Sequence, residues 1–457
     1  MSLARLLEKR THLIPGKLKV SELFFEVPKD YSKPSDGKLR IFARSAEKAE
    51  KPVDPPTTDD KKQLPWFVYL QGGPGFGCAP PGSYPATSFI LDKGYQMLYI
   101  DQRGTGLSSP ISASTLPLQG SPENQAEYLK LFRADSIVRD CEEIRKLLTK
   151  DYPEEKRKWS ILGQSFGGFC AITYLSKFPQ GLREVFLCGG LAPIVNNPDI
   201  VYRNTYRRVE KRNKAFYEKY PEDIERVKSI VNHLDQKSIA LPSGGTLSPS
   251  RFLQIGINFG GHGGLDSVHD VVLTASTDLK DVGFLTRPTL ARIEGNLSFD
   301  DAVIYAILHE SIYCQGEPST WSADRLLAEY PQFDIQSRAS TQNNDEPVLF
   351  RGEMIYREMF ESFSELRKIR EAAEIVANMT DWPTLYDEEQ LAKNEVPVFS
   401  STYMEDMYVD FDLAQQTASK IKNCQQFIAN RMYHDAFRSK SDEVMRQLFA
   451  LRDDSID

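Results

Sequence analysis

The segment around Ser165 constrains the fold of this chain more than any other. Residues 159–162 (Trp-Ser-Ile-Leu) form a short apolar run, residues 163–167 read Gly-Gln-Ser-Phe-Gly, and residues 169–175 continue as an apolar run. A strand, a tight turn with serine at its apex and a helix make a nucleophile elbow, in which glycine on both sides lets strand and helix pass closely. The elbow presents the serine hydroxyl at a helix N-terminus, where backbone N–H groups can receive a developing oxyanion. The pattern therefore predicts a serine nucleophile.

Apolar runs elsewhere in the first half of the chain fit the setting that an elbow requires. They lie at residues 65–70, 95–100 and 182–187, and a helical pattern spans residues 124–148. Strands that alternate with helices form a mostly parallel sheet with helices on both faces. Residues 18–27 and 38–44 alternate apolar and polar residues around a turn signal, which predicts an antiparallel pair at a sheet edge. This setting favours the elbow over its alternative, a glycine-rich surface turn.

The alternation of expected strands and helices ends after about residue 193. Charged segments with helical spacing follow, and no strand alternates with them until residues 398–403. We therefore expect residues 194–393 to form a mostly helical cap, inserted after the sixth strand over the strand ends. Residues 1–193 and 394–457 would then make up one catalytic domain.

A serine hydroxyl needs a base within hydrogen-bond reach before it becomes a good nucleophile. Of the six histidines, only His434 follows an expected core strand on the far side of the insertion, and Asp406 follows the preceding strand. Reactive groups collect at the carboxyl ends of strands in open α/β sheets. The order Ser165, Asp406, His434 is the order of the catalytic triad in α/β-hydrolases, which is the fold we expect. Asp410 and Asp412 are the competing acids, but both lie near the start of the next expected helix.

Two glycine-rich segments follow the expected strands. Residues 71–77 read Gln-Gly-Gly-Pro-Gly-Phe-Gly, and backbone of this kind can approach a ligand and present free N–H groups. A phosphate-binding loop is excluded there, because no Lys-Ser or Lys-Thr pair follows. We expect the oxyanion hole to consist of N–H groups of Phe166 and Gly73. Residues 101–108 are more typical of a structural turn, which the Asp and Arg side chains within the turn would hold in place.

Three motifs in this order carry a family resemblance. Residues 71–75, 101–106 and 163–168 together resemble the proline iminopeptidase (prolyl aminopeptidase) family of serine peptidases, and above all its larger members. The likeness spans the core on both sides of the insertion and includes the segments of Asp406 and His434. Smaller members commonly carry His where this chain has Gln71. The resemblance implies release of an N-terminal proline from a peptide, with no metal and no cofactor.

Exopeptidases of this family hold the free ammonium of the substrate with carboxylates from the cap, so the resemblance also implies amine-binding glutamates. Glu310, in a cap segment at residues 306–313 that resembles the family's, is the first candidate, and Glu294 is the second. Glu405 is a third possibility, and the alternative for each is a solvated glutamate on a helix face. Aromatic residues of the insertion would supply a proline-sized apolar pocket or belong to its core; they are Phe259, Phe299, Tyr305 and Tyr313.

Composition limits the partners and the compartment. The net charge of −8 argues against nucleic acid or an anionic membrane as a partner. No run of about 18 apolar residues exists, so we expect no membrane span. The N-terminus lacks the apolar segment of a secretory signal, and the six cysteines are scattered like free thiols. These features predict a cytoplasmic enzyme, and they leave the oligomeric state open.

Two other functions stay open at this point. A hydrolase on the same scaffold would act on an ester, a lactone or another small molecule, because the lid sets the specificity and the fold does not. A non-catalytic binding protein would keep the hydrolase fold without catalysing a reaction. The intact set of Ser165, Asp406 and His434 argues against this alternative.

Overall fold

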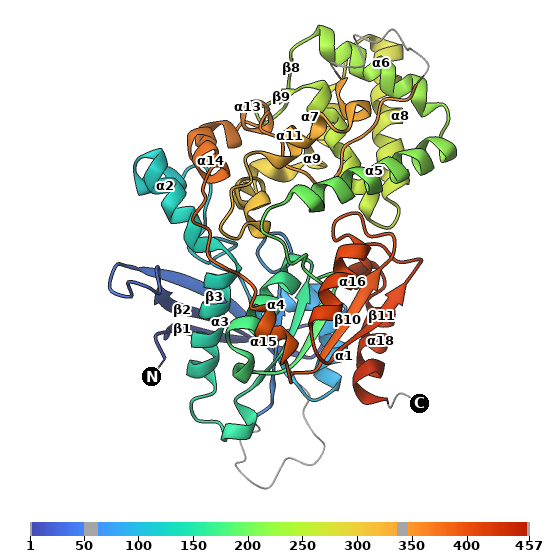
Figure 1. The fold of residues 1–457 in the computed structure, drawn as a ribbon. Coiled ribbons are helices and arrows are strands. Elements are labelled where there is room, and N and C mark those ends of the chain that lie inside the picture. The colour runs from blue at the N-terminus through green and yellow to red at the C-terminus, as the bar shows by residue number, and fades with distance from the viewer. Residues whose placement is uncertain (1, 50–62, 336–345, 455–457) are drawn as a thin grey trace.

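The computed structural model describes residues 2–49, 63–335 and 346–454. Within these residues a nine-stranded sheet runs in the order β1-β2-β3-β5-β4-β6-β7-β10-β11 and forms the lower half of the molecule in Figure 1. β1, β2, β3 and β5 pair antiparallel, and the pairs from β5 through to β11 are parallel. The expected mostly parallel sheet flanked by helices is confirmed. Among the described residues, none of the helices combines the length and apolarity needed to cross a bilayer.

The strands of the sheet have the following bounds: β1 (Arg5–Ile14), β2 (Leu18–Pro28), β3 (Lys38–Lys48), β4 (Trp66–Leu70), β5 (Gln96–Ile100), β6 (Trp159–Gln164), β7 (Leu182–Cys188), β10 (Val398–Tyr403) and β11 (Cys424–Ala429). Every residue of β4, β5, β6 and β10 is buried, which explains why β4, β5 and β6 read as mainly apolar runs. Successive side chains alternate between the faces. In β4, Val68 packs into the core on one face, and Phe67 and Tyr69 pack into the core on the other.

Helices cover both faces of the sheet. One core contains apolar residues of α3 (Ala134–Leu148), α4 (Phe166–Lys177), α15 (Glu388–Ala392) and α16 (Phe411–Lys420). The core on the opposite face contains residues of α1 (Ala86–Asp92), α17 (Ala436–Ser439) and α18 (Ser441–Asp453). α2 (Pro122–Leu129) lies beside the insertion, in contact with α14. The carboxyl ends of the parallel strands point toward the helical half of the molecule (Figure 1).

The N-terminal strands differ from the expectation. β2 and β3 form the expected antiparallel pair, but β1 pairs with β2 and occupies the sheet edge instead of them. β1 is mostly exposed, so its sequence lacks the alternation that marks a half-buried strand. Because of this extra strand, the insertion follows the seventh strand of the described residues, β7, and not the sixth.

The described strands between β7 and β10 are the short pair β8 (Ile239–Ala240) and β9 (Thr246–Leu247), the other regular elements described there are helices, and most of this insertion forms the upper half of Figure 1. The α-helices of this upper half in the described residues are α5 (Asp199–Lys219), α6 (Asp223–Gln236), α7 (Pro249–Leu253), α8 (Gly264–Val282), α9 (Arg287–Gly295), α10 (Val303–Leu308), α11 (Ser322–Leu327), α13 (Met359–Ser362) and α14 (Arg370–Ala377). α15, which also lies between β7 and β10, packs against α4 on the sheet.

Two expected helices are interrupted. Residues 124–148 divide into α2 and α3 at Arg133, which takes an extended conformation (φ −90°, ψ 176°). Its guanidinium donates to the carbonyl oxygen of Cys314 in the insertion, 2.8 Å away. Residues 200–234 divide into α5 and α6 at Pro221, since a proline cannot continue the hydrogen bonds of a helix interior.

Candidate active site

The elbow is built by the close approach of β6 and α4. Ser165 lies between them with φ 52° and ψ −124°, a conformation that residues other than glycine rarely adopt. A Cβ atom added at Gly163 would lie 2.5 Å from the carbonyl oxygen of Gly167, and one added at Gly167 would lie 1.9 Å from that of Leu70. Only glycine fits at either position, so both glycines of the motif are explained by packing.

His434 and Asp406 meet although 28 residues separate them. Nδ1 of His434 lies 2.8 Å from Oδ2 of Asp406. The other carboxylate oxygen, Oδ1, accepts hydrogen bonds from the backbone N–H groups of Tyr408 (2.8 Å) and Val409 (3.0 Å). Asp406 is buried, so these bonds fix its carboxylate with one oxygen free for the imidazole.

The competing acids lie elsewhere. The Asp410 carboxylate caps α16, accepting from the N–H groups of Asp412 (3.1 Å) and Leu413 (3.2 Å), and it forms an ion pair with Arg208 at 2.9 Å. Asp412 is exposed and lies in the first turn of α16. Neither contacts His434, so the geometry favours Asp406 as the partner of the imidazole.

The environment of His434 favours its charged form. Burial lowers the pKa of the imidazole, but the charge and hydrogen bond of Asp406 raise it, with smaller contributions from Glu353 and Asp435. The net effect raises the pKa of His434 above its ordinary value. An imidazole in this setting is a stronger base than a free histidine and stabilises its own imidazolium.

Ser165 and His434 line one cavity of about 530 Å³, between the strand ends and the insertion. Gly72 and Gly73 of the glycine-rich segment also line it, and a Cβ added at Gly72 would lie 3.1 Å from Cβ of Ser165. Phe166 is the first residue of α4, where a backbone N–H has no partner within the helix. The cavity is completed by Gln71, Phe76, Gly77, Gln164, Ile257, Asn258, Gly261, Asn296, Leu297, Phe299, Ala302, Tyr305, Glu353, Tyr408, Asp435 and Arg438.

The glutamates expected from the sequence do not line this cavity. Glu310 is buried inside the insertion, and its Oε1 accepts a hydrogen bond from the N–H of Ala323 at 3.1 Å in the first turn of α11. Burial raises the pKa of Glu310 to about 7, against the opposing effect of its hydrogen bonds. Glu294 accepts hydrogen bonds from Ser243, and Glu405 forms an ion pair with Lys211 at 2.6 Å.

A different glutamate, Glu353, lines the cavity. Its side chain is 14% exposed, and one carboxylate oxygen accepts a hydrogen bond from the hydroxyl of Tyr305. The other oxygen lies 3.8 Å from Nε2 of His309, whose Nδ1 lies 3.0 Å from the hydroxyl of Tyr202. The sequence offered little signal for Glu353, because it lies between α11 and α13 in a segment without helix or strand periodicity.

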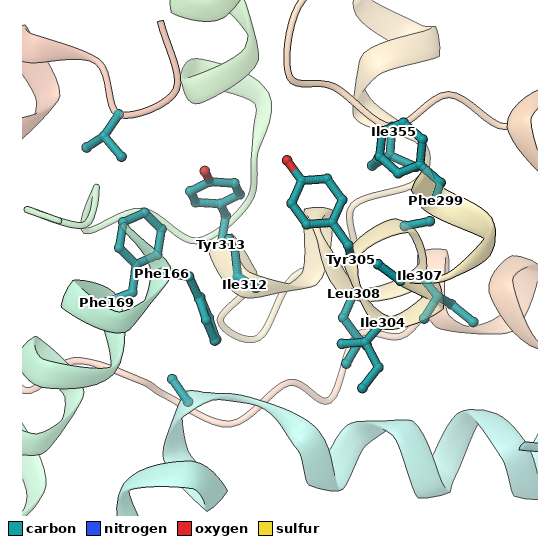
Figure 2. Close-up of a cluster of buried hydrophobic side chains, with 14 of the residues drawn as sticks. Phe166, Phe169, Phe299, Ile304, Tyr305, Ile307, Leu308, Ile312, Tyr313 and Ile355 are labelled. Atoms are coloured by element: carbon teal, nitrogen blue, oxygen red, sulfur yellow. The ribbon is translucent and has the colours of Figure 1, made fainter. Parts of the chain in front are cut away.

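The aromatic residues divide between cavity and core. Phe299 and Tyr305 line the cavity, whereas Phe259 and Tyr313 belong to the buried core. Figure 2 shows Tyr305 and Tyr313 on one cap segment with their hydroxyl groups pointing in similar directions. The Tyr313 ring packs against Phe169 of α4 with centroids 5.9 Å apart, so this segment joins the insertion to the elbow helix.

The turn at residues 101–108 has a structural role. The Asp101 carboxylate accepts from the N–H groups of Cys78 (2.7 Å) and Leu107 (2.9 Å). The buried Arg103 guanidinium forms an ion pair with Asp140 at 2.6 Å. The turn therefore fixes the loops beside the cavity, and neither of its charged side chains lines the cavity.

Comparison with known proteins identifies the family. The family model described as alpha/beta hydrolase fold matches residues 65–231. The protein named proline iminopeptidase aneH from Aspergillus aculeatus is 48% identical over 99% of this chain and 98% of its own length. A proline iminopeptidase of Aeromonas sobria is 40% identical over 94% of this chain and 96% of its own length, and one of Neisseria gonorrhoeae is 27% identical over 26% of this chain and 33% of its own length. With two such relatives aligned over nearly its whole length, the chain belongs to the proline iminopeptidase family of the α/β-hydrolase fold.

Proposed function

We propose that this protein is a serine aminopeptidase that releases N-terminal proline from peptides, with Ser165 as nucleophile, His434 as base and Asp406 as its partner. The observation that carries the proposal is one cavity that brings together the elbow serine, the paired imidazole and the carboxylate of Glu353. The names of the full-length relatives support the choice of proline as the released residue.

In the proposed reaction Ser165 Oγ attacks the carbonyl carbon of the N-terminal proline while His434 takes the hydroxyl proton. The N–H groups of Phe166 and Gly73 receive the oxyanion, and each such donor typically lowers the barrier by about 3 kcal/mol. His434 then gives its proton to the leaving amine, which departs as the shortened peptide and leaves a prolyl ester on Ser165. Water, deprotonated by His434, attacks that ester. The bond to Ser165 Oγ breaks, proline is released, and His434 returns the proton to Oγ. Asp406 holds the imidazole tautomer and stabilises the imidazolium throughout.

We assign the substrate ammonium to Glu353 in place of Glu310 and Glu294. The attraction between an ammonium and a carboxylate that is only 14% exposed is much stronger than that between the same groups on a solvent-exposed surface, because solvent screens the two charges less. The Tyr305 hydroxyl holds one oxygen of Glu353 in place. Phe299, Tyr305 and Leu297 line the same cavity and offer an apolar surface for the pyrrolidine ring.

We further propose that residues 194–393 act as a cap domain on a catalytic domain of residues 1–193 and 394–457. Phe299, Tyr305 and Glu353 all come from the insertion, whereas Ser165 and His434 come from outside it. The cap would thus set which amino acid enters, and the sheet would supply the chemistry. The expectation of a cytoplasmic location rests on the sequence alone and stays a prediction.

A substrate panel tests the proposal. Purified protein is assayed with aryl amides of proline and of other amino acids, with N-acetylproline aryl amide, and with simple acyl esters. We expect kcat/KM to be highest for the proline amide with a free amine, and acetylation to abolish most of the activity because it removes the ammonium. A preference for acetylated or ester substrates would instead identify an esterase on the same scaffold. Loss of all activity in Ser165→Ala is the control for a contaminating peptidase.

A further inference from the structure

The cavity has a side that faces the leaving group. This inference rests on the proposed function: His434 gives its proton to the departing amine, so the peptide beyond the proline lies on the side of His434. The cavity wall there includes residues that follow His434 in the chain, Asp435 and Arg438, the second of them on α17. Any group that recognises the departing peptide is therefore expected on this segment.

Arg438 brings a positive charge to that wall. It forms no ion pair with a carboxylate in the described part of the chain, and it is an exposed residue that lines the cavity. Its guanidinium interacts with the hydroxyl of Tyr69. That hydroxyl also lies 2.7 Å from Oε1 of Gln71 and 2.9 Å from Oε1 of Gln164, two buried residues that line the cavity. The guanidinium therefore lies beside a polar part of the cavity wall.

The acidic residue that follows His434, Asp435, also lines the cavity and is already engaged. Oδ1 of Asp435 lies 2.6 Å from Nδ1 of His262 and accepts the backbone N–H of His262 at 3.0 Å. Glu353, the other carboxylate of the cavity lining, comes from the insertion and contacts Tyr305 and His309. The cavity lining thus carries a carboxylate from the cap and, from the segment after His434, a guanidinium without a carboxylate partner among the described residues. A substrate with an ammonium at one end and a carboxylate at the other matches this arrangement.

We propose that Arg438 binds the free C-terminal carboxylate of short substrates, so that the preferred peptides are prolyl dipeptides and tripeptides. Their carboxylate lies within one or two residues of the scissile bond, and an extended residue spans at most about 3.6 Å. Longer peptides place their carboxylate outside the cavity and gain nothing from Arg438. Because Arg438 is exposed, its contribution is that of a screened ion pair, about fivefold in kcat/KM.

The experiment compares Pro-Ala with Pro-Ala amide and Pro-Ala-Ala with its amide, by release of free proline. The unmodified protein is expected to prefer each free acid by about fivefold, mainly through a lower KM, and the preference should shrink as salt is raised. In Arg438→Gln the ratio of free acid to amide should fall to about one, and Arg438→Lys should restore part of it because the charge returns. Lys440→Gln removes the same charge two residues away, outside the cavity lining, and should keep the preference.

The outcomes separate the two proposals. Equal kcat/KM for acid and amide in the unmodified protein, or an unchanged ratio in Arg438→Gln, overturns the carboxylate subsite while leaving proline release intact. A loss in Arg438→Gln that is equal for acid and amide assigns Arg438 a structural role and also overturns it. No hydrolysis of proline aryl amide by the unmodified protein overturns the proposed function itself.

Discussion

Replacing Glu353 with Gln is the sharpest perturbation of the proposed amine site. Gln keeps the shape of the side chain and an oxygen that accepts from the Tyr305 hydroxyl, and it removes only the charge. For two unit charges about 4 Å apart, the Coulomb energy is about 4 kcal/mol at the effective dielectric of a site near the protein surface. Since Gln still offers a hydrogen bond to the ammonium, we expect a loss of about 2–3 kcal/mol, or about 30- to 150-fold in kcat/KM for proline aryl amide.

The assay includes matched controls within the same chain. Glu310→Gln and Glu294→Gln remove the same charge from glutamates that do not line the cavity, and each should cost much less activity. Because Glu353 also contributes to the raised pKa of His434, Glu353→Gln should shift the acid limb of the pH profile to lower pH, which misfolding would not do. The reasoning is refuted if Glu353→Gln stays within threefold of the unmodified protein, or if Glu310→Gln is the variant that loses activity.

Three further predictions concern the elbow, the base and a buried acid. Gly167→Ala should lower the thermal midpoint of unfolding by several degrees, since its Cβ would lie 1.9 Å from a carbonyl oxygen and overpacking typically costs about 1–3 kcal/mol. Gly295→Ala is the control: nothing lies within 4 Å of its added Cβ, so the midpoint should stay unchanged or rise. Equal shifts in the two variants would contradict the prediction. The raised pKa of His434 places the acid limb of kcat/KM above pH 6.5, with activity rising as the imidazole loses its proton, and a limb well below pH 6 would contradict this. Because the pKa of Glu310 is raised to about 7 in the folded protein, the unfolded chain loses this proton first as pH rises from about 4.5 to 7, and stability falls over that window. In denaturant titrations, the free energy of unfolding should fall less between pH 5 and pH 8 for Glu310→Gln than for the unmodified protein. An identical fall in both would refute this prediction.

The sequence was most informative where backbone geometry leaves no choice of residue. Gly163 and Gly167 lie where an added Cβ would collide with backbone, so the elbow can be predicted from its glycines. Asp406 and His434 follow adjacent parallel strands, and the carboxyl ends of such strands meet at one edge of the sheet. Residues held by sheet topology are therefore predictable although they are far apart in the chain.

The parts that the sequence did not predict depend on contacts across the insertion. Glu310 resembles a family position, but its carboxylate turns toward the N–H of Ala323 inside the cap, and nothing in its local pattern reveals that direction. Glu353 lies in a segment without periodicity, so only the three-dimensional packing brings it to the cavity. Arg133 interrupts an apparently continuous helix, and its side chain bonds to a carbonyl of the insertion, a contact that the local pattern does not reveal.

Mapping the site of covalent modification tests the central claim most directly, that Ser165 is the nucleophile and is activated by His434. The protein is incubated with a diphenyl phosphonate analogue of proline, and the adduct is located by mass spectrometry of peptides. We predict a single adduct on Ser165, absent in Ser165→Ala and strongly slowed in His434→Ala. An adduct on another residue, or continued hydrolysis of proline aryl amide by Ser165→Ala, would contradict the account.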